Sequence, residues 1–192
     1  MPDAAYLSAS AAKTRDDRLK AFTDGEVTAQ IASFEPIAER YLGAAQTPRT
    51  TTYTANGHRG TTFELPHVQV TAVSAVTLDG TALSSDQRAT IVPNIARGSL
   101  YYPGGWCADT VTVAYTHGLA AVPAAVLDAC TEYVVSVLTS RKSGASRNTL
   151  SVATDVGTTR YSTPDWGAGR PTGWLEVDRL LNSARDYRIM VA

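Results

Sequence analysis

The amino-acid sequence predicts an α+β fold: a helical core of two long amphipathic helices, an inserted antiparallel β subdomain, and an extended C-terminal arm that ends in a short helix. Residues 16–43 and 122–141 carry apolar residues every three to five positions, which is typical of helices with one buried face. Between them, residues 50–116 form Thr-rich and aromatic runs separated by turn residues, which is typical of β-strands. Residues 142–172 are rich in Ser, Thr and Gly and predict the arm. The predicted domains are a helical core at 1–48 and 117–141, a β subdomain at 49–116, and the arm with its terminal helix at 142–192.

The two long helices have recognisable ends. The first begins near Asp16, where the helix dipole favours an acidic side chain, and it is expected to stop at Gly43. Pro36 is expected to kink or break this helix, and a shorter helical piece is predicted around residues 6–13. The second helix carries Pro123 in its first turn, where the missing N–H group costs nothing.

The β subdomain is predicted to be a compact antiparallel unit. Residues 56–60 are expected to close a hairpin, and Asp79-Gly80 predicts a second tight turn. In the last strand, apolar and polar residues alternate from 111 to 115, so its apolar side chains are expected to face a core. Strands are predicted at residues 50–54, 61–65, 68–78, 81–83, 89–92, 99–102 and 110–116.

The bulk composition favours a globular protein that associates with copies of itself. The hydrophobic fraction is 44% and the charged fraction is 18%, as in folded domains. Seventeen Lys and Arg residues against eighteen Asp and Glu residues give a net charge of −1. This balance argues against a dedicated nucleic-acid-binding protein, which usually carries a strong basic excess. A net charge near zero also favours self-association.

The cysteines and the N-terminus predict synthesis in the cytosol. Cys107 and Cys130 are too few for a disulfide framework and are interpreted as reduced thiols. No apolar run approaches the roughly 20 residues that a membrane helix requires. The N-terminal residues lack the basic segment and apolar core of a secretory signal.

The sequence predicts no catalytic residue, no metal site and no cofactor. Its three histidines, His58, His67 and His117, have no partner at metal-ligand spacing and are interpreted as residues of turns and strand ends. The sharpest catalytic hypothesis pairs Cys107 as a nucleophile with His117 as its base. These residues flank the same predicted strand, which would place them roughly 30 Å apart. The pair is therefore interpreted as a loop cysteine and a strand-end histidine.

Two stretches carry a family resemblance. The first is Val111-Thr112-Val113-Ala114-Tyr115-Thr116-His117-Gly118 before Pro123, and the second is Gly169-Arg170-Pro171-Thr172-Gly173 before Glu176-Val177-Asp178-Arg179-Leu180-Leu181. With the order of helix, β segment, helix and arm, they resemble the head–tail connector (adaptor) proteins of long-tailed bacteriophages, particularly those of actinobacteria. The β stretch is longer than in the smallest members of that family, which are nearly all helix.

The resemblance implies a structural subunit of the virion rather than an enzyme. Copies would form a homo-oligomeric ring, expected to be twelvefold, in the neck of the particle. The partners implied are the portal protein on one side and a stopper or tail-terminator protein on the other. DNA would pass through the ring without sequence-specific binding, and no membrane is involved. The helix at 122–141 is expected near the ring core.

Three groups of residues are candidates for contacts with these partners, and two of them also have a simpler structural interpretation. The basic residues around the end of the second helix fit favourable charges at a helix end, and the aromatic loop fits a cover for the β subdomain. Within the third group, Trp174→Ala is expected to leave the monomer folded but to stop heads from joining tails. The candidates are Arg141, Lys142 and Arg147; Tyr101, Tyr102 and Trp106; and, in the arm and its end, Arg160, Tyr161, Arg170, Pro171 and Trp174.

Alternative functions remain open at this point. The chain could be another neck or tail component, such as a stopper or tail terminator, although those proteins are more often dominated by β-structure. It could be a binding module that presents the Tyr/Trp loop of its β subdomain to a sugar or a protein. An enzyme that uses Cys107 is the third alternative.

Overall fold

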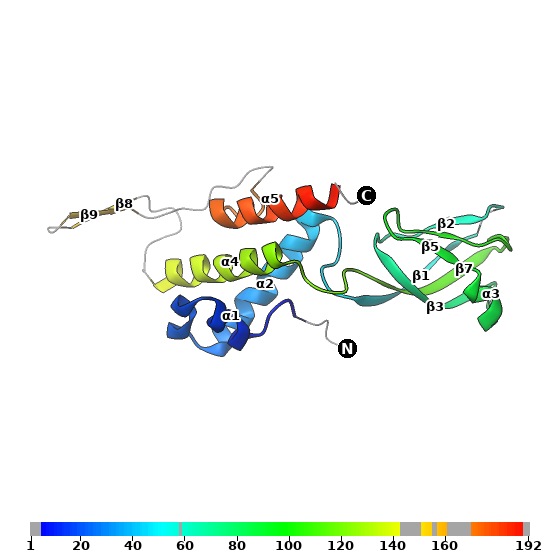
Figure 1. Cartoon of the computed structure of the whole chain (residues 1–192), viewed down its shortest axis with the longest axis horizontal. Helices are drawn as coiled ribbons and strands as arrows, with labels where there is room; N and C mark the ends of the chain where they lie inside the picture. The colour runs from blue at the N-terminus through cyan, green and yellow to red at the C-terminus, as the bar shows by residue number, and fades with distance from the viewer. Residues whose placement is uncertain (1–4, 58, 143–150, 155–156, 161–169, 190–192) are drawn as a thin grey trace. The chain divides into compact units, whose positions relative to one another are not determined.

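The computed structural model describes residues 5–57, 59–142, 151–154, 157–160 and 170–189, with side chains over 5–57, 59–142 and 170–185. The chain folds into two compact units. We call them the helical unit, Ala5–Gly43 with Val122–Ala192, and the β unit, Ala44–Ala121. The predicted α+β fold with an inserted β subdomain is confirmed (Figure 1).

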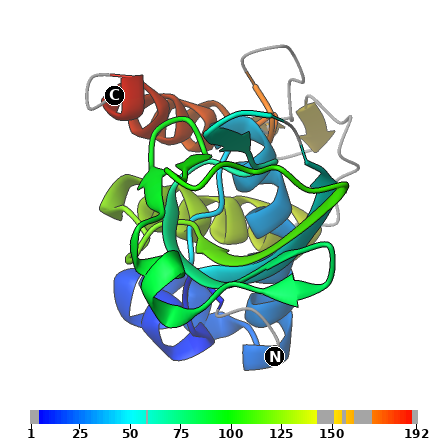
Figure 2. The same ribbon diagram turned by 90° about the vertical axis from the view of Figure 1, so that its right-hand side faces the viewer.

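The helical unit is built around α2 and α4, with α5 on one side of α4 and α1 on the other (Figures 1 and 2). Large apolar side chains from these helices share one core, in which the Phe34 ring lies 5.3 Å from that of Tyr133. A two-stranded antiparallel sheet, β8–β9, belongs to the same unit. The elements are α1 (Ala9–Arg15), the 3-10 helix η1 (Asp17–Ala21), α2 (Asp24–Leu42), α4 (Ala124–Lys142), β8 (Ser151–Thr154), β9 (Gly157–Arg160) and α5 (Leu175–Ile189).

The first long helix begins later than predicted. Thr23 and Glu26 form a capping box, in which the Thr23 hydroxyl accepts a hydrogen bond from the Glu26 amide and the Glu26 carboxylate accepts one from the Thr23 amide. Asp16 instead caps η1, a separate turn. Pro36 lies inside α2 without ending it, since buried neighbours such as Phe34 and Ala38 hold both halves against the core. The predicted stop at Gly43 is confirmed by its left-handed conformation, φ 70°.

The β unit contains two antiparallel sheets around a second core. One has the strand order β1-β7-β3-β4 and the other β2-β6-β5. The apolar face predicted for the last strand is confirmed, because Val111, Val113 and Tyr115 are fully buried. The elements are β1 (Arg49–Asn56), β2 (Thr62–Glu64), β3 (Val70–Leu78), β4 (Thr81–Ala82), α3 (Ser85–Ala89), β5 (Val92–Asn94), β6 (Ser99–Tyr101) and β7 (Thr110–His117).

One predicted turn is confirmed and one is wrong. Asp79 and Gly80, at φ 48° and 79°, connect β3 to β4 as expected for a tight turn. Residues 56–60 do not close a hairpin, because β1 pairs with β7 and β2 pairs with β6. Gly57 is needed there for close packing, since a Cβ atom on it would lie 2.1 Å from the carbonyl oxygen of Ala108.

Candidate functional site

A groove in the helical unit collects two of the predicted contact residues. It has a volume of ≈ 620 Å³ and lies between the start of α2, the end of η1 and the end of α4. Arg141 and Lys142, both exposed, belong to its lining, and the Lys142 ammonium lies 5.6 Å from the centroid of the Phe22 ring. We call it the α2–α4 groove; its lining residues are Ala21, Phe22, Gly25, Glu26, Ala29, Gln30, Leu138, Arg141 and Lys142.

The charged side chains of the α2–α4 groove differ in whether they have a bonding partner within the subunit. The Glu26 carboxylate is held by Thr23, and these hydrogen bonds lower its pKa. Arg141 and Lys142 form no ion pair with any residue that the structure describes. They lie at the C-terminal end of α4, where the helix dipole favours positive charge. Among the described residues, the groove therefore offers two cations without an ion-pair partner, next to the apolar side chains of Phe22, Ala29 and Leu138.

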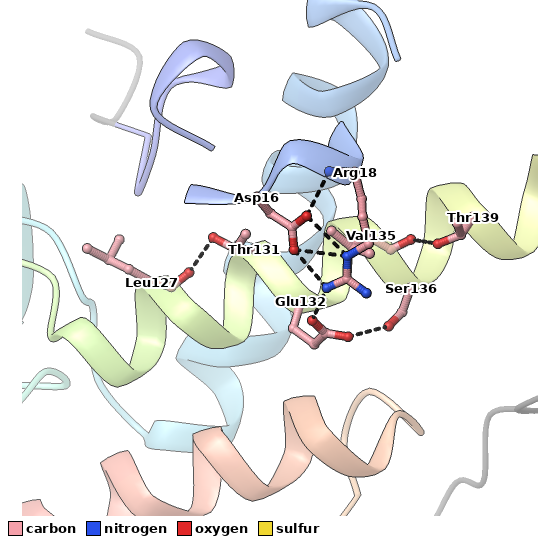
Figure 3. A network of polar contacts seen from close by, with 8 residues as sticks. All are labelled: Asp16, Arg18, Leu127, Thr131, Glu132, Val135, Ser136 and Thr139. Carbon is pink, nitrogen blue, oxygen red and sulfur yellow. Dashed lines mark hydrogen bonds and ion pairs between the residues drawn. The ribbon is translucent and has the colours of Figure 1, made fainter. Parts of the chain in front are cut away.

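A polar network joins η1 and the residue before it to α4 (Figure 3). Arg18 of η1 donates hydrogen bonds to Asp16 at 2.7 Å and to Glu132 of α4 at 2.9 Å. The hydrogen bonds from Arg18 lower the pKa of Asp16, and those with Asp16 and Glu132 raise the pKa of Arg18. The Arg15 guanidinium pairs with Asp128 of α4 at 2.7 Å. These contacts attach the segment that leads to Phe22 to the side of α4.

The start of α5 is fixed by a second network, which is buried. Asp178 accepts hydrogen bonds from the amide and the hydroxyl of Thr172, at 3.0 and 2.6 Å, and the Thr172 hydroxyl accepts one from the Trp174 amide. Both Thr172 and Asp178 are buried. Leu175, the first residue of the helix, is 66% exposed, and the Glu176 side chain is 64% exposed. The apolar side chain of Leu175 and the acidic side chain of Glu176 are therefore exposed to solvent, while the buried hydrogen bonds of Asp178 hold the start of the helix in place.

The residues predicted at the end of the arm separate into two kinds. Trp174 is 9% exposed and belongs to the core of the helical unit, so its indole packs inside the subunit. Arg170 is exposed and Pro171 is partly exposed. Arg147 and Tyr161 lie outside the described residues, as does the side chain of Arg160.

The aromatic loop is largely core. Trp106 is fully buried and its indole N–H donates to the Thr61 carbonyl at 3.1 Å, and Tyr102 packs against it. Tyr101 is 47% exposed and lies beside two other exposed apolar residues, Val92 and Ile95. We call Val92, Pro93, Ile95 and Tyr101 the β5–β6 patch. Of the three aromatic candidates, Tyr101 alone presents a large surface to solvent.

Sequence reasoning missed Leu175 and Phe22 as surface candidates. The exposure of Leu175 could have been predicted from the helical periodicity. The buried residues Trp174, Val177 and Leu181 follow one another at spacings of three and four, and Leu175 lies outside that stripe. Phe22 falls within the range predicted for the first helix, 16–43, but it lies between η1 and α2 and is only partly buried. The capping box formed by Thr23 and Glu26 is the sequence signal that places Phe22 before the helix.

The two residues of the Cys107–His117 hypothesis lie toward opposite ends of β7. Cys107 is exposed in the loop before β7, whereas His117 at the end of that strand stacks on His67. Cys130 is buried, and burial raises the pKa of its thiol to about 12. Within the described ranges, no three or more His, Cys, Asp or Glu side chains gather as a metal site requires. Among the helices described, none is long and apolar enough to cross a membrane.

Known proteins share sequence and structural features with this chain. The family model for head completion proteins matches residues 10–157. The chain is similar to a solved structure described as the neck of an empty gene transfer agent (GTA) particle computed with C6 symmetry, with a TM-score of 0.56 and 20% identity over 73% of this chain and 82% of that chain. A second structure, the neck of the native GTA particle computed with C12 symmetry, gives a TM-score of 0.48 and 19% identity over 81% and 88% of the two chains. No curated protein sequence matches. The first likeness shows a shared fold.

Proposed function

Because this chain belongs to the head completion protein family, we propose that it is a head-to-tail adaptor, a structural subunit of the neck that joins a viral head to its tail. The observation that carries the proposal is the family match, which runs from α1 across the β unit and α4. The fold shared with a neck structure of a gene transfer agent particle supports the same assignment. In this role the protein acts passively and performs no catalysis.

The adaptor is proposed to work as a closed ring, with twelve copies as the expected number. The similar neck structure was computed with C6 symmetry, and a twelvefold ring also obeys sixfold symmetry. A ring requires a heterologous interface, in which one side of the subunit fits a different side of its neighbour. The net charge of −1 leaves little long-range repulsion between copies.

The ring would lie between the portal protein and a stopper or tail-terminator protein and continue the DNA channel. Lys and Arg do not exceed Asp and Glu in this chain, which suits a channel that lets DNA slide without holding it. Arg170 and Pro171, which are accessible at the end of the arm, are candidates for contacts with the portal or a neighbouring subunit.

The proposal is tested by the mass of the purified protein, alone and mixed with candidate portal rings. Light scattering and negative-stain imaging should show a ring that forms either alone or on the portal. Particles made without the protein should contain heads that have not joined tails. A protein that stays monomeric with every portal tested, together with normally tailed particles in its absence, would overturn the adaptor assignment.

A second candidate function is a binding module carried by the β unit. It is favoured by the β5–β6 patch, where Val92, Ile95 and Tyr101 are 58%, 56% and 47% exposed. Neighbouring exposed apolar residues of this kind often mark contact surfaces. Tyr101→Ser with Ile95→Ser should abolish binding by such a module and leave ring formation unchanged. Glycan arrays and tail-joining assays with this variant separate the two functions.

A further inference from the structure

We propose that neighbouring copies in the ring dock head to tail, with the start of α5 of one copy seated in the α2–α4 groove of the next. Leu175 would enter the groove, and Glu176 would pair with Arg141 and Lys142. The proposal rests on the proposed ring function and names the contact that closes the ring.

The groove selects an occupant that is both apolar and acidic. The apolar side chains of Phe22, Ala29 and Leu138 line it, while Arg141 and Lys142 supply cations without a described carboxylate partner. Lys142 lies over the Phe22 ring, so part of its charge faces the groove. An acidic side chain next to an exposed apolar one satisfies both requirements.

The start of α5 has that composition. Leu175 is the most exposed large apolar side chain among the described residues, at 66%. Glu176 follows it, and its contact with Arg179 is long, 3.9 Å, and open to solvent, which leaves the carboxylate available to a second cation. The buried Thr172–Asp178 hydrogen bonds hold this end of the helix in place, so docking orders few additional groups.

The positions of the two surfaces suit a ring. α5 lies on one side of α4 and α1 on the other (Figures 1 and 2). The groove is lined by residues from the end of η1, the start of α2 and the end of α4. Both surfaces belong to the same compact unit and share its core. Each copy therefore presents one docking helix and one groove, which is the requirement for a heterologous interface that repeats.

Crosslinking tests the contact directly. Ala29 in the groove and Leu175 are both exposed, so each is replaced by Cys in a Cys107→Ser background, where the remaining thiol, Cys130, is buried. With a short bismaleimide, assembled protein that carries both Ala29→Cys and Leu175→Cys should give a ladder of multimers. Each single variant should stop at dimers, because a subunit with one reactive thiol forms one crosslink.

Charge exchange tests the pairing. Glu176→Arg should lower the assembled fraction about tenfold, because like charges face each other in the interface. Arg141→Glu with Lys142→Glu should have the same effect, and the three changes together should restore assembly. Asp86→Arg is the matched control, since Asp86 is also an exposed acid in the first turn of a helix but lies in the β unit. Thermal denaturation shows that each variant is folded.

The outcomes separate this contact from the ring function. Rings that form normally but give no ladder beyond dimers, or that tolerate Glu176→Arg, overturn the docking and leave the adaptor assignment standing. Docking of α5 onto the portal would give crosslinks between the two proteins in place of the ladder, and this result also overturns it. A wild-type protein that never assembles, alone or with portal rings, overturns the ring function and the docking together.

Discussion

The imidazole rings of His67 and His117 stack face to face, with centroids 4.0 Å apart and planes 14° from parallel. His67 Nδ1 hydrogen-bonds with the Tyr115 hydroxyl at 2.6 Å, and His117 Nε2 hydrogen-bonds with the Thr51 hydroxyl at 3.2 Å. His117 is 4% exposed. The two histidines therefore join the segment before β3 to the end of β7 and support the sheet of the β unit.

Tyr115→Phe is expected to destabilise the β unit by about 1–2 kcal/mol, because it removes the hydroxyl that hydrogen-bonds with His67. Tyr53→Phe is the matched control, since the Tyr53 hydroxyl has no hydrogen-bond partner in the described part of the chain, and it should change stability little. Differential scanning calorimetry of the two variants and the wild type measures the difference. Equal effects from both substitutions would contradict a supporting role for the His67–Tyr115 contact.

Asp16→Asn is expected to destabilise the helical unit by about 1 kcal/mol at pH 7, a value reduced for partial solvent exposure. The pKa of Asp16 in the folded protein lies below its ordinary value of 3.8, because the Arg18 side chain donates hydrogen bonds to the carboxylate. The ionised carboxylate therefore adds stability above about pH 4, and this contribution is lost as the pH falls through the lowered pKa. Urea denaturation at a series of pH values should show the two proteins converging below pH 4. A constant difference at every pH would exclude the charge as its origin.

The two cysteines are expected to differ completely in reactivity. Cys107 is exposed, whereas Cys130 is buried with its pKa raised to about 12, so its reactive thiolate is scarce at neutral pH. Native protein should take up one maleimide per chain, and protein unfolded in urea should take up two. Mass spectrometry counts the adducts, and Cys107→Ser should abolish labelling of the native state. Rapid labelling of Cys130 in native protein would show that the core of the helical unit opens.

Trp174→Ala is expected to destabilise the helical unit by about 3–5 kcal/mol, because the indole packs in its core. The sequence alone suggests a contact residue whose loss leaves the monomer folded, whereas its burial predicts a loss of fold. Leu175→Ala at the next position should leave the melting temperature nearly unchanged, since that side chain is exposed. Thermal denaturation followed by circular dichroism compares them. A Trp174→Ala variant as stable as the wild type would return this residue to the contact surface.

Local patterns in the sequence were enough to predict most elements of this fold. The stop at Gly43, the turn at Asp79-Gly80 and the buried face of β7 depend on neighbouring residues, and each is confirmed. The hairpin at 56–60 was wrong because strand pairing is non-local: Tyr53 pairs with Val113, sixty positions along the chain. Turn residues indicate where a strand ends but not which strand it pairs with.

The candidate site was less predictable than the fold. Arg141 and Lys142 were identified from the basic end of their helix, but the groove beside them depends on how η1 packs on α4. That packing is set by Arg18 and Glu132, which are 114 positions apart and have no common motif. In the aromatic loop the sequence identified the residues but not their exposure, because composition does not distinguish buried Trp106 from exposed Tyr101.

The β unit begins and ends at one point of its own sheet, because Arg49, the first residue of β1, is the register partner of His117, the last residue of β7. A domain whose two ends meet can be gained, lost or exchanged by a single recombination event without stretching the chain that receives it. The same property makes this position a practical site for genetic labelling. A fluorescent protein whose own termini lie close together could be inserted at this position without separating Arg49 from His117.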